Sequence, residues 1–340
     1  MLSLCEHSNH IPSACPENNQ MNATESATEV VASMLADVIN TGERKKLTAE
    51  DIYASVNARI DAALERGTVP WLQPWIGGDN YARNLQSGKA YRGINALLLS
   101  SFINPDFTDP RWTTFAAAKK MGGSVRKGEK SSLVTLWKRI RIKDPDADGG
   151  SRTIGLLRYF RVFNVEQVRW PEGVLSPFER EARPDGWDAD AAAESTLDAF
   201  LASANAPTIG YGGSSAHYSP GTHSLQLPLR GAFRSAAGFY GTAFHECAHS
   251  TGHKSMLDRS LTCKVGDSYA REELVAEFTS TMVCASVGVD GAFENSAAYI
   301  NSWRQRISAD PKLLVTAAGK AQKASDRILG IENTYTEAAL

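Results

Sequence analysis

The 340-residue sequence lacks the features that mark several common classes of protein. No apolar run approaches the roughly 20 residues that a membrane-spanning helix needs. The N-terminus has no basic segment followed by an apolar stretch, so a secretory signal is not expected. The five cysteines are odd in number and show no C-x-x-C spacing, which favours reduced thiols over a disulfide framework. We therefore expect a cytoplasmic protein with no membrane partner.

Net charge is also nearly absent, at -2 for the whole chain, but this value conceals an uneven distribution. Between Tyr81 and Lys143 there are thirteen Lys and Arg residues against three acidic ones, an excess of ten positive charges. The remainder of the chain must then carry a charge of -12. A basic half joined to an acidic half predicts a module that binds a polyanion beside a module with another task.

The basic half has neither helix-turn-helix nor zinc-finger spacing, and aromatic residues are interspersed among its cations. Cations neutralise phosphates, and exposed aromatic rings stack on unpaired bases, so we expect single-stranded DNA as the partner. The aromatic residues Trp71, Trp75 and Trp112 are equally compatible with a hydrophobic core. The candidate DNA-binding residues are Arg83, Lys89, Tyr91, Arg92, Lys119, Lys120, Arg126, Lys127, Lys130, Lys138, Arg139 and Arg141.

Composition and periodicity divide the chain into five segments. We expect a mobile N-terminal tail over 1–47, because this stretch is polar and has little core pattern. A DNA-binding domain follows over 48–170, opening with a helix capped at Thr48 and continuing through helices and two strands. A linker rich in Pro, Gly and charge spans 171–188. A second, mainly helical domain with a β-hairpin covers 189–330, before a C-terminal tail over 331–340.

The second domain contains the sequence His245-Glu246-Cys247-Ala248-His249 within an apolar run that is compatible with a helix. Two imidazoles four residues apart lie on one helix face, so both can bind a single metal ion. Glu246 is placed to take a proton from a water molecule that the metal activates. This pattern is typical of zinc hydrolases, but it also arises by chance and needs a third ligand.

A carboxylate on a later helix supplies that ligand. Glu273 lies 28 residues after His245, in a segment that resembles the E-x-x-A-[DE] element of gluzincin-like peptidases. We assign Glu273 as the ligand and Glu277, one helical turn later, as the group that hydrogen-bonds a ligating histidine. An exchange of these two roles, or ligation by Glu272, stays open. One zinc ion with an open position for water is expected.

His253 is the other histidine near the motif, and its position argues against ligation. It lies eight residues after His245 and just beyond Gly252, whereas the metzincin pattern places its third histidine at a position occupied here by Ser255. We interpret His253 as a helix C-cap or as a group that supports a ligand. An oxyanion-stabilising residue is also required, and Tyr269, Tyr240 and Arg234 are the candidates between which the sequence does not choose.

With both halves considered, the chain resembles the ArdC-type antirestriction proteins of conjugative plasmids and related mobile elements. The resemblance runs in collinear order over about residues 48–330. Its segments are Ile52–Ile60, Gly67–Trp71, Tyr91–Asn95, Gly128–Lys130, Tyr159–Val165, Phe244–His253, Glu272–Glu277 and Lys320–Asp326.

This resemblance implies an α+β protein: a mixed α/β domain that binds single-stranded DNA, then a mainly helical zincin-like metallopeptidase domain with a small β-hairpin. It implies protection of incoming plasmid DNA against host restriction. Two other functions stay open. One is a DNA-dependent protease that acts on proteins bound or crosslinked to DNA; the other is a DNA-coating protein whose zinc site is purely structural. Glu246 favours a hydrolase, because a structural site needs no general base.

Overall fold

The structure is a computed structural model that describes residues 47–66, 82–100, 103–143, 151–178, 188–259, 261, 267–289 and 297–332. Within these ranges, the side chains at 137–143, 153–156, 267–268 and 297–300 are not described. Nearly all of the expected tails, half of the expected linker (179–187), and Trp71 and Trp75 lie outside the described residues. Among the helices that are described, none is long and apolar enough to cross a bilayer.

Helix α2 (Ala49–Glu65) opens the described chain, and its start follows the expected capping box. The Thr48 hydroxyl accepts from the backbone N–H of Asp51, whose carboxylate accepts from the backbone N–H of Thr48. These two bonds satisfy donors that the first helical turn cannot pair internally. Ile52, Val56 and Ile60 recur at helical spacing and are buried, so α2 presents one apolar face to the protein.

A four-stranded sheet with order β1-β2-β5-β4 forms the scaffold of the N-terminal half. Its centre is the long antiparallel pair of β4 and β5, confirming the two strands expected from alternating, β-branched residues. Thr113 and Thr114 pair with β5 as part of β2, so the helix that follows them begins only at Phe115. The elements are β1 (Arg83–Asn84), α3 (Ile94–Leu98), β2 (Arg111–Thr114), α4 (Phe115–Lys120), β3 (Ser124–Val125), β4 (Ser132–Lys143), β5 (Ser151–Asn164), η1 (Val165–Gln167) and β6 (Val168–Arg169).

The C-terminal half is mainly helical and carries a small three-stranded sheet with order β7-β9-β8. The expected hairpin is confirmed as β8 and β9, whereas β7, which pairs parallel to β9, was not expected. Its elements are α5 (Ala189–Leu201), β7 (Thr208–Tyr211), β8 (His217–Ser219), β9 (Ser224–Leu227), η2 (Arg230–Ala232), α6 (Ala236–Thr251), α7 (Asp267–Val287), α8 (Ala297–Ala309) and α9 (Leu313–Ile328). The chain is thus a mixed α/β protein whose C-terminal region is helical.

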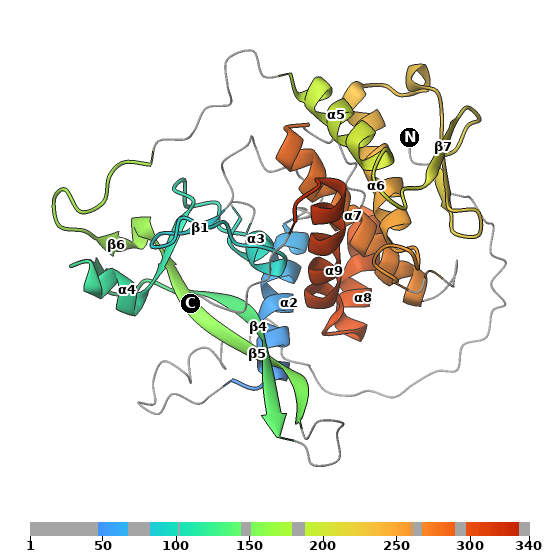
Figure 1. Ribbon diagram of the computed structural model, residues 1–340. Coiled ribbons are helices and arrows are strands. Elements are labelled where there is room, and N and C mark those ends of the chain that lie inside the picture. Colours follow the sequence, from blue (N-terminus) through green and yellow to red (C-terminus); the bar gives the residue numbers. More distant parts are fainter. Residues whose placement is uncertain are drawn as a thin grey trace, which may run out of the picture.

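The largest hydrophobic cluster contains residues from both halves of the chain. Ile52 and Ile60 of α2 and Leu97 of α3 belong to the same buried cluster as Phe278 of α7 and Leu314 of α9. Figure 1 shows α2 between the long β-strands and the C-terminal helices. A second cluster lies within the C-terminal half, around α5, α6 and α7. The apolar faces of α2 and α3 are therefore covered by helices α7 and α9, which come from the other half of the chain.

Candidate metal centre

Helix α6 carries the two histidines on one face. Ser235 caps its start, because the Ser235 hydroxyl accepts from the backbone N–H of Gly238. His245 and His249 lie one turn apart near its end, and their Nε2 atoms are 3.1 Å from each other. Two ring nitrogens that converge in this way can share one ion.

Helix α7 brings the carboxylate. It packs closely on α6, where the buried Ser280 hydroxyl donates to the Gly241 carbonyl across 2.8 Å, and Ala276 is fully buried at the contact. Glu273 lies three residues before Ala276 and reaches the histidines. Its carboxylate oxygens lie 3.4 Å from His245 Nε2 and 3.4 Å from His249 Nε2. The structure thus assembles all three predicted ligands, one ligand atom of each lying within 4.8 Å of the others.

The spacing of these ligand atoms fits a bound divalent ion. Bonds of about 2.0–2.1 Å to a tetrahedral zinc ion place ligand atoms roughly 3.3–3.4 Å apart. Adjacent ligands of an octahedral ion with bonds of about 2.1 Å lie roughly 3.0 Å apart. The two Nε2 atoms are 3.1 Å apart, and each lies 3.4 Å from a different oxygen of Glu273. Two imidazoles and one carboxylate therefore suit a metal ion here, and their geometry alone does not select zinc.

The electrostatics of the three groups are strongly coupled. Burial lowers the pKa of His249, but hydrogen bonds with Glu272 and Glu273 outweigh burial and raise this pKa to about 10. Burial also opposes ionisation of Glu273, whereas hydrogen bonds from His245 and His249 hold its pKa well below its usual range. Without a metal ion, His249 therefore keeps a proton at neutral pH. A metal ion must displace that proton in order to bind.

Arg259 is a residue of the site that sequence reasoning missed. Its side chain is 4% exposed and donates to both oxygens of Glu272, at 2.6 and 3.1 Å. It also donates to the Ala248 carbonyl at 2.6 Å. Glu272 in turn lies 3.5 Å from His249 Nδ1. Arg259 thus orients the carboxylate that orients a predicted ligand.

Gly252 makes room for this arrangement. A Cβ atom at Gly252 would lie 2.8 Å from the Leu261 side chain and 3.0 Å from Arg259 Nη2. The loop after α6 is tied back by a bond from the Arg259 N–H to the Gly252 carbonyl. Because Arg259 sits in a loop without periodic pattern, the only sequence signal for it is the glycine that ends α6.

The residues near the ligands include one carboxylate that was not predicted as a supporting group. At His249 Nδ1 the neighbouring carboxylate is Glu272, the residue weighed above only as an alternative ligand. Glu277 is half-buried, one turn after Glu273 on α7. His253 is turned toward the β8–β9 hairpin, where its ring stacks on His223 with centroids 4.0 Å apart. The metal-binding group within the described residues does not include His253.

The remaining groups near the ligands have distinct environments. Glu246 is 7% exposed. The neighbouring thiol of Cys247 is fully buried, and burial raises its pKa, so Cys247 stays protonated. Tyr240 is engaged with Glu194, to which its hydroxyl donates across 2.8 Å.

Helix geometry separates the other two oxyanion candidates. Arg234 lies before Ser235, the N-cap of α6, and the helix from Ala236 to His245 rises roughly 14 Å. Tyr269 is exposed and lies one turn before Glu273, on the same helix face. This spacing favours Tyr269 over Arg234.

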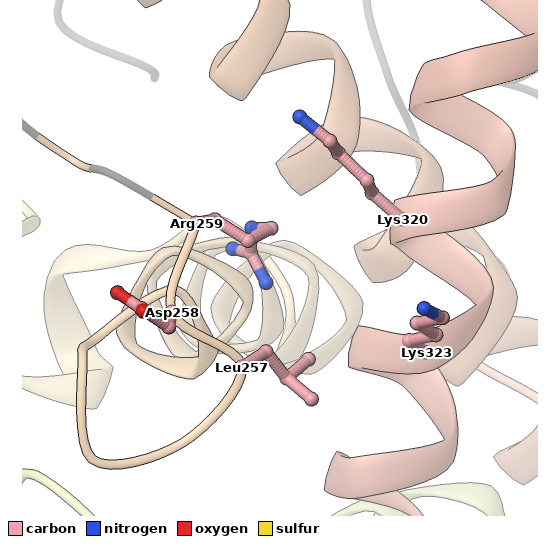
Figure 2. A pocket seen from close by; sticks show the side chains of 5 residues that line it. All are labelled: Leu257, Asp258, Arg259, Lys320 and Lys323. Carbon is pink, nitrogen blue, oxygen red and sulfur yellow. The ribbon is translucent and has the colours of Figure 1, made fainter. Parts of the chain in front are cut away.

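Arg259 also lines a pocket of about 370 Å³. Figure 2 shows it between the loop after α6 and helix α9, lined by Leu257, Asp258, Arg259, Lys320 and Lys323. The three candidate ligands are not among these lining residues. The pocket therefore adjoins the arginine that orients Glu272.

Most of the described candidates for DNA binding are solvent-exposed, and three are held in the fold. Arg83 is half-buried, with its guanidinium 5.6 Å from the centre of the Phe178 ring. Tyr91 packs against the cluster around Trp112. Arg92 forms an ion pair with Asp326 of α9. The side chains of Lys138, Arg139 and Arg141 lie outside the described residues. Those exposed are Lys89, Lys119, Lys120, Arg126, Lys127 and Lys130.

Fold and site together define a protein in which a basic α/β half precedes a helical half carrying a zincin-like metal centre. Two family models match this division. The model described as the N-terminal domain of the anti-restriction factor ArdC matches residues 50–163. The model described as a zincin-like metallopeptidase matches residues 195–320.

Solved structures extend the match over most of the chain. The crystal structure of the antirestriction protein ArdC from plasmid R388, in its Mn(II)-bound form, is 34% identical with a TM-score of 0.65; the match covers 84% of this chain and all of that one. The metal-free form gives 35% identity and a TM-score of 0.61, over 82% of this chain and 96% of that chain. The chain belongs to the ArdC family of antirestriction proteins.

Two further relatives differ in length. The uncharacterized protein y4eC of Sinorhizobium fredii is 34% identical over 299 residues, which are 84% of this chain and 94% of the relative. The DNA primase TraC of Escherichia coli is 35% identical over 301 residues, which are 82% of this chain. The chain spans about a quarter of that primase, 27% of its length.

Proposed function

We propose that this chain protects the DNA of a mobile genetic element in the cytoplasm by binding single-stranded DNA and hydrolysing a protein near it. The basic N-terminal half, at about 48–170, would bind the DNA. The C-terminal half, at about 189–330, would be a peptidase with one zinc ion held by His245, His249 and Glu273. The protein substrate would be recognised in the neighbourhood of the bound strand.

The observation that carries the peptidase proposal is the position of Glu246. A structural metal site needs only ligands, and a carboxylate placed in the ligating helix between two histidines has no role in it. Glu246 is nearly buried beside the three ligand residues. A general base in this position is what hydrolysis requires and what metal binding alone does not.

The chemistry divides between the metal and the chain. A bound zinc ion lowers the pKa of a water molecule and polarises a carbonyl. Glu246 accepts the proton of the attacking water on its carboxylate and then passes it to the departing amine. Arg259 and Glu272 hold His249 in one orientation throughout, which keeps the ligand set preorganised. Tyr269 is the group proposed to donate to the developing oxyanion.

The DNA-binding proposal rests on charge and exposure. Lys119, Lys120, Arg126, Lys127 and Lys130 are all exposed. Lys127 and Gly128 form the centre of a turn in which the Glu129 N–H donates to the Arg126 carbonyl, and Gly128 has φ +91°. This is the geometry of a type II turn, which needs glycine at its third position. The turn presents its cations away from the body of the protein.

The decisive experiment replaces Glu246 with Gln in the full-length chain. Gln keeps the shape of the side chain but removes its basicity, so we expect unchanged metal content and unchanged binding of a 30-nucleotide oligo(dT). Cleavage of labelled casein with oligo(dT) present should fall at least 100-fold, the scale of a lost general base. His245→Ala is the matched control that should lose both metal and cleavage.

Protection of transferred DNA from restriction, measured with the same variants, separates the proposed roles. Loss of protection in Glu246→Gln supports a peptidase that serves antirestriction. Full protection by this variant would contradict that role and leave a DNA-coating protein. Cleavage confined to proteins crosslinked to the DNA would instead identify a DNA-dependent protease.

A further inference from the structure

The aromatic side chains of the basic half that the structure describes differ in their exposure to solvent. Trp112 is buried in the core with Val134 and Val162. The hydroxyl of Tyr159 accepts from the backbone N–H of Leu47, and its ring packs against the largest core cluster. By contrast Phe115, which has no aromatic neighbour in the sequence, is 58% exposed.

Phe115 is held in this position by the termini of α4. Thr114 caps the helix, with its hydroxyl accepting from the Ala117 N–H. At the other end, Gly122 has φ +82°, and the N–H of Gly123 donates to the Ala118 carbonyl. This is a Schellman closure, which fixes a short helix firmly. The fold therefore specifies the position of Phe115 without burying its ring.

A second ring lies beside it. Phe163 of β5 is half-buried, and its ring centroid is 6.5 Å from that of Phe115 at an interplanar angle of 60°. The two rings form an edge-to-face pair on the surface. Exposed apolar side chains scattered singly need no explanation, but a rigid aromatic pair in a basic region does.

Cations surround this aromatic pair. Lys119 lies one helical turn after Phe115 and therefore shares its face of α4. Arg161 lies two residues before Phe163 and shares its face of β5. The guanidinium of Arg161 donates to the Ser131 hydroxyl across 3.4 Å, which brings the exposed Lys130 into the same region. Positive charge around the rings would not strengthen binding of an apolar protein partner. It would strengthen binding of a polyanion that also carries flat apolar groups.

We propose that Phe115 and Phe163 form a stacking platform for an unpaired base of single-stranded DNA, with Lys119, Lys130 and Arg161 binding the flanking phosphates. This inference rests on the proposed function and gives it a specific site. Any base offers a π-face, so the platform is tolerant of sequence. Figure 1 places α4 on the opposite side of the molecule from α6, so the strand contacts the protein away from the metal centre.

The test measures binding of full-length variants to oligo(dT) of 20 nucleotides, and to the same backbone carrying abasic sites, by fluorescence anisotropy. Phe115→Ala and Phe115→Leu should each weaken binding to oligo(dT) about fivefold to a hundredfold, the loss of one stacked base. Phe115→Trp should retain it. Leu229→Ala is the control, because Leu229 is equally exposed but lies in the other half.

The salt dependence separates the two parts of the platform. Phe115→Ala should lower affinity at every salt concentration with an unchanged slope, while Lys119→Ala should reduce the slope by about 0.7, the value for one phosphate of a single strand. On the abasic oligonucleotide the effect of Phe115→Ala should vanish.

Several results would overturn the inference. Wild-type binding with the expected salt dependence but no effect of Phe115→Ala would remove the platform and leave the proposed function standing. Retained affinity in Phe115→Leu would mean an apolar contact without base stacking. If the wild-type chain does not bind oligo(dT) at any salt concentration, the proposed function fails and the platform with it.

Discussion

The pair of Glu272 and His249 offers the sharpest quantitative prediction. Replacing Glu272 with Gln preserves its shape but removes the charge that lies 3.5 Å from His249 Nδ1. At an effective dielectric constant of about 20, a unit charge at this distance contributes about 5 kcal/mol before compensation. Arg259 lies closer to the same carboxylate, at 2.6 Å, and cancels much of this term. We therefore expect metal affinity to fall about 10- to 100-fold, or about 1.4–2.7 kcal/mol.

The assay is a competition titration of the metal-free chain with a chromophoric chelator, carried out separately with Zn(II) and Mn(II). Glu129→Gln is the matched control, because it makes the same chemical change to a carboxylate that pairs with an arginine, Arg126, in the N-terminal half. The structure predicts a clearly larger loss for Glu272→Gln than for Glu129→Gln. Equal losses, or no loss for Glu272→Gln, would refute the assignment of Glu272 as the group that orients His249.

Two further predictions concern protonation and the contact between the halves. Because the pKa of His249 is raised to about 10 without metal, metal affinity should rise about tenfold per pH unit from pH 6 to 9, and a plateau at pH 7 would contradict that shift. The raised pKa also means that protonated His249 stabilises the folded state of the metal-free protein. This stabilisation should be complete below about pH 6.5, the pKa of histidine in the unfolded chain, and should be lost as the pH rises through about 10. Asp326→Asn should lower the free energy of unfolding by about 1–3 kcal/mol, measured by denaturant titration. The Asp326 side chain is only 5% exposed, which makes loss of its partner costly. The Arg92 side chain is 42% exposed, so solvent screening keeps the loss below that of a fully buried pair. A larger effect of Arg92→Ala on DNA affinity than on stability would indicate that its main role is phosphate binding.

Local patterns predicted the helices and the long strands well, because their causes are local. The capping box at Thr48, the periodic face of α2, and the i, i+4 histidines of α6 all act within one or two turns. The position of Glu273 beside the histidines was also accessible, since a carboxylate at a characteristic distance along the chain restricts the choice to a few residues of one helix.

The residues that orient His249 could not be predicted from the sequence in the same way. Helical periodicity indicates which carboxylates share a face with Glu273, but it does not show that Glu272 lies beside His249 Nδ1. The direction of His249 Nδ1 depends instead on the loop after α6, which carries Arg259 to Glu272 with no periodic signal. The aromatic residues of the basic half illustrate the same limit. Composition identifies Trp112 and Phe115 equally, and only the packing of β2 and α4 separates the buried ring from the exposed one.

The hydrophobic cluster that joins α2 and α3 to α7 and α9 has a consequence for how the two halves can be inherited and exchanged. A protein segment that ended between the two halves would expose the apolar faces of both. The two halves differ in their proposed functions, but they do not fold independently. The match to TraC agrees with this, because it covers 82% of the chain and therefore includes residues from both halves. Since α7 also carries Glu273, any ion bound there stabilises the helices that cover α2. The free energy of metal binding is thus shared with the half of the protein that contains no metal ligand.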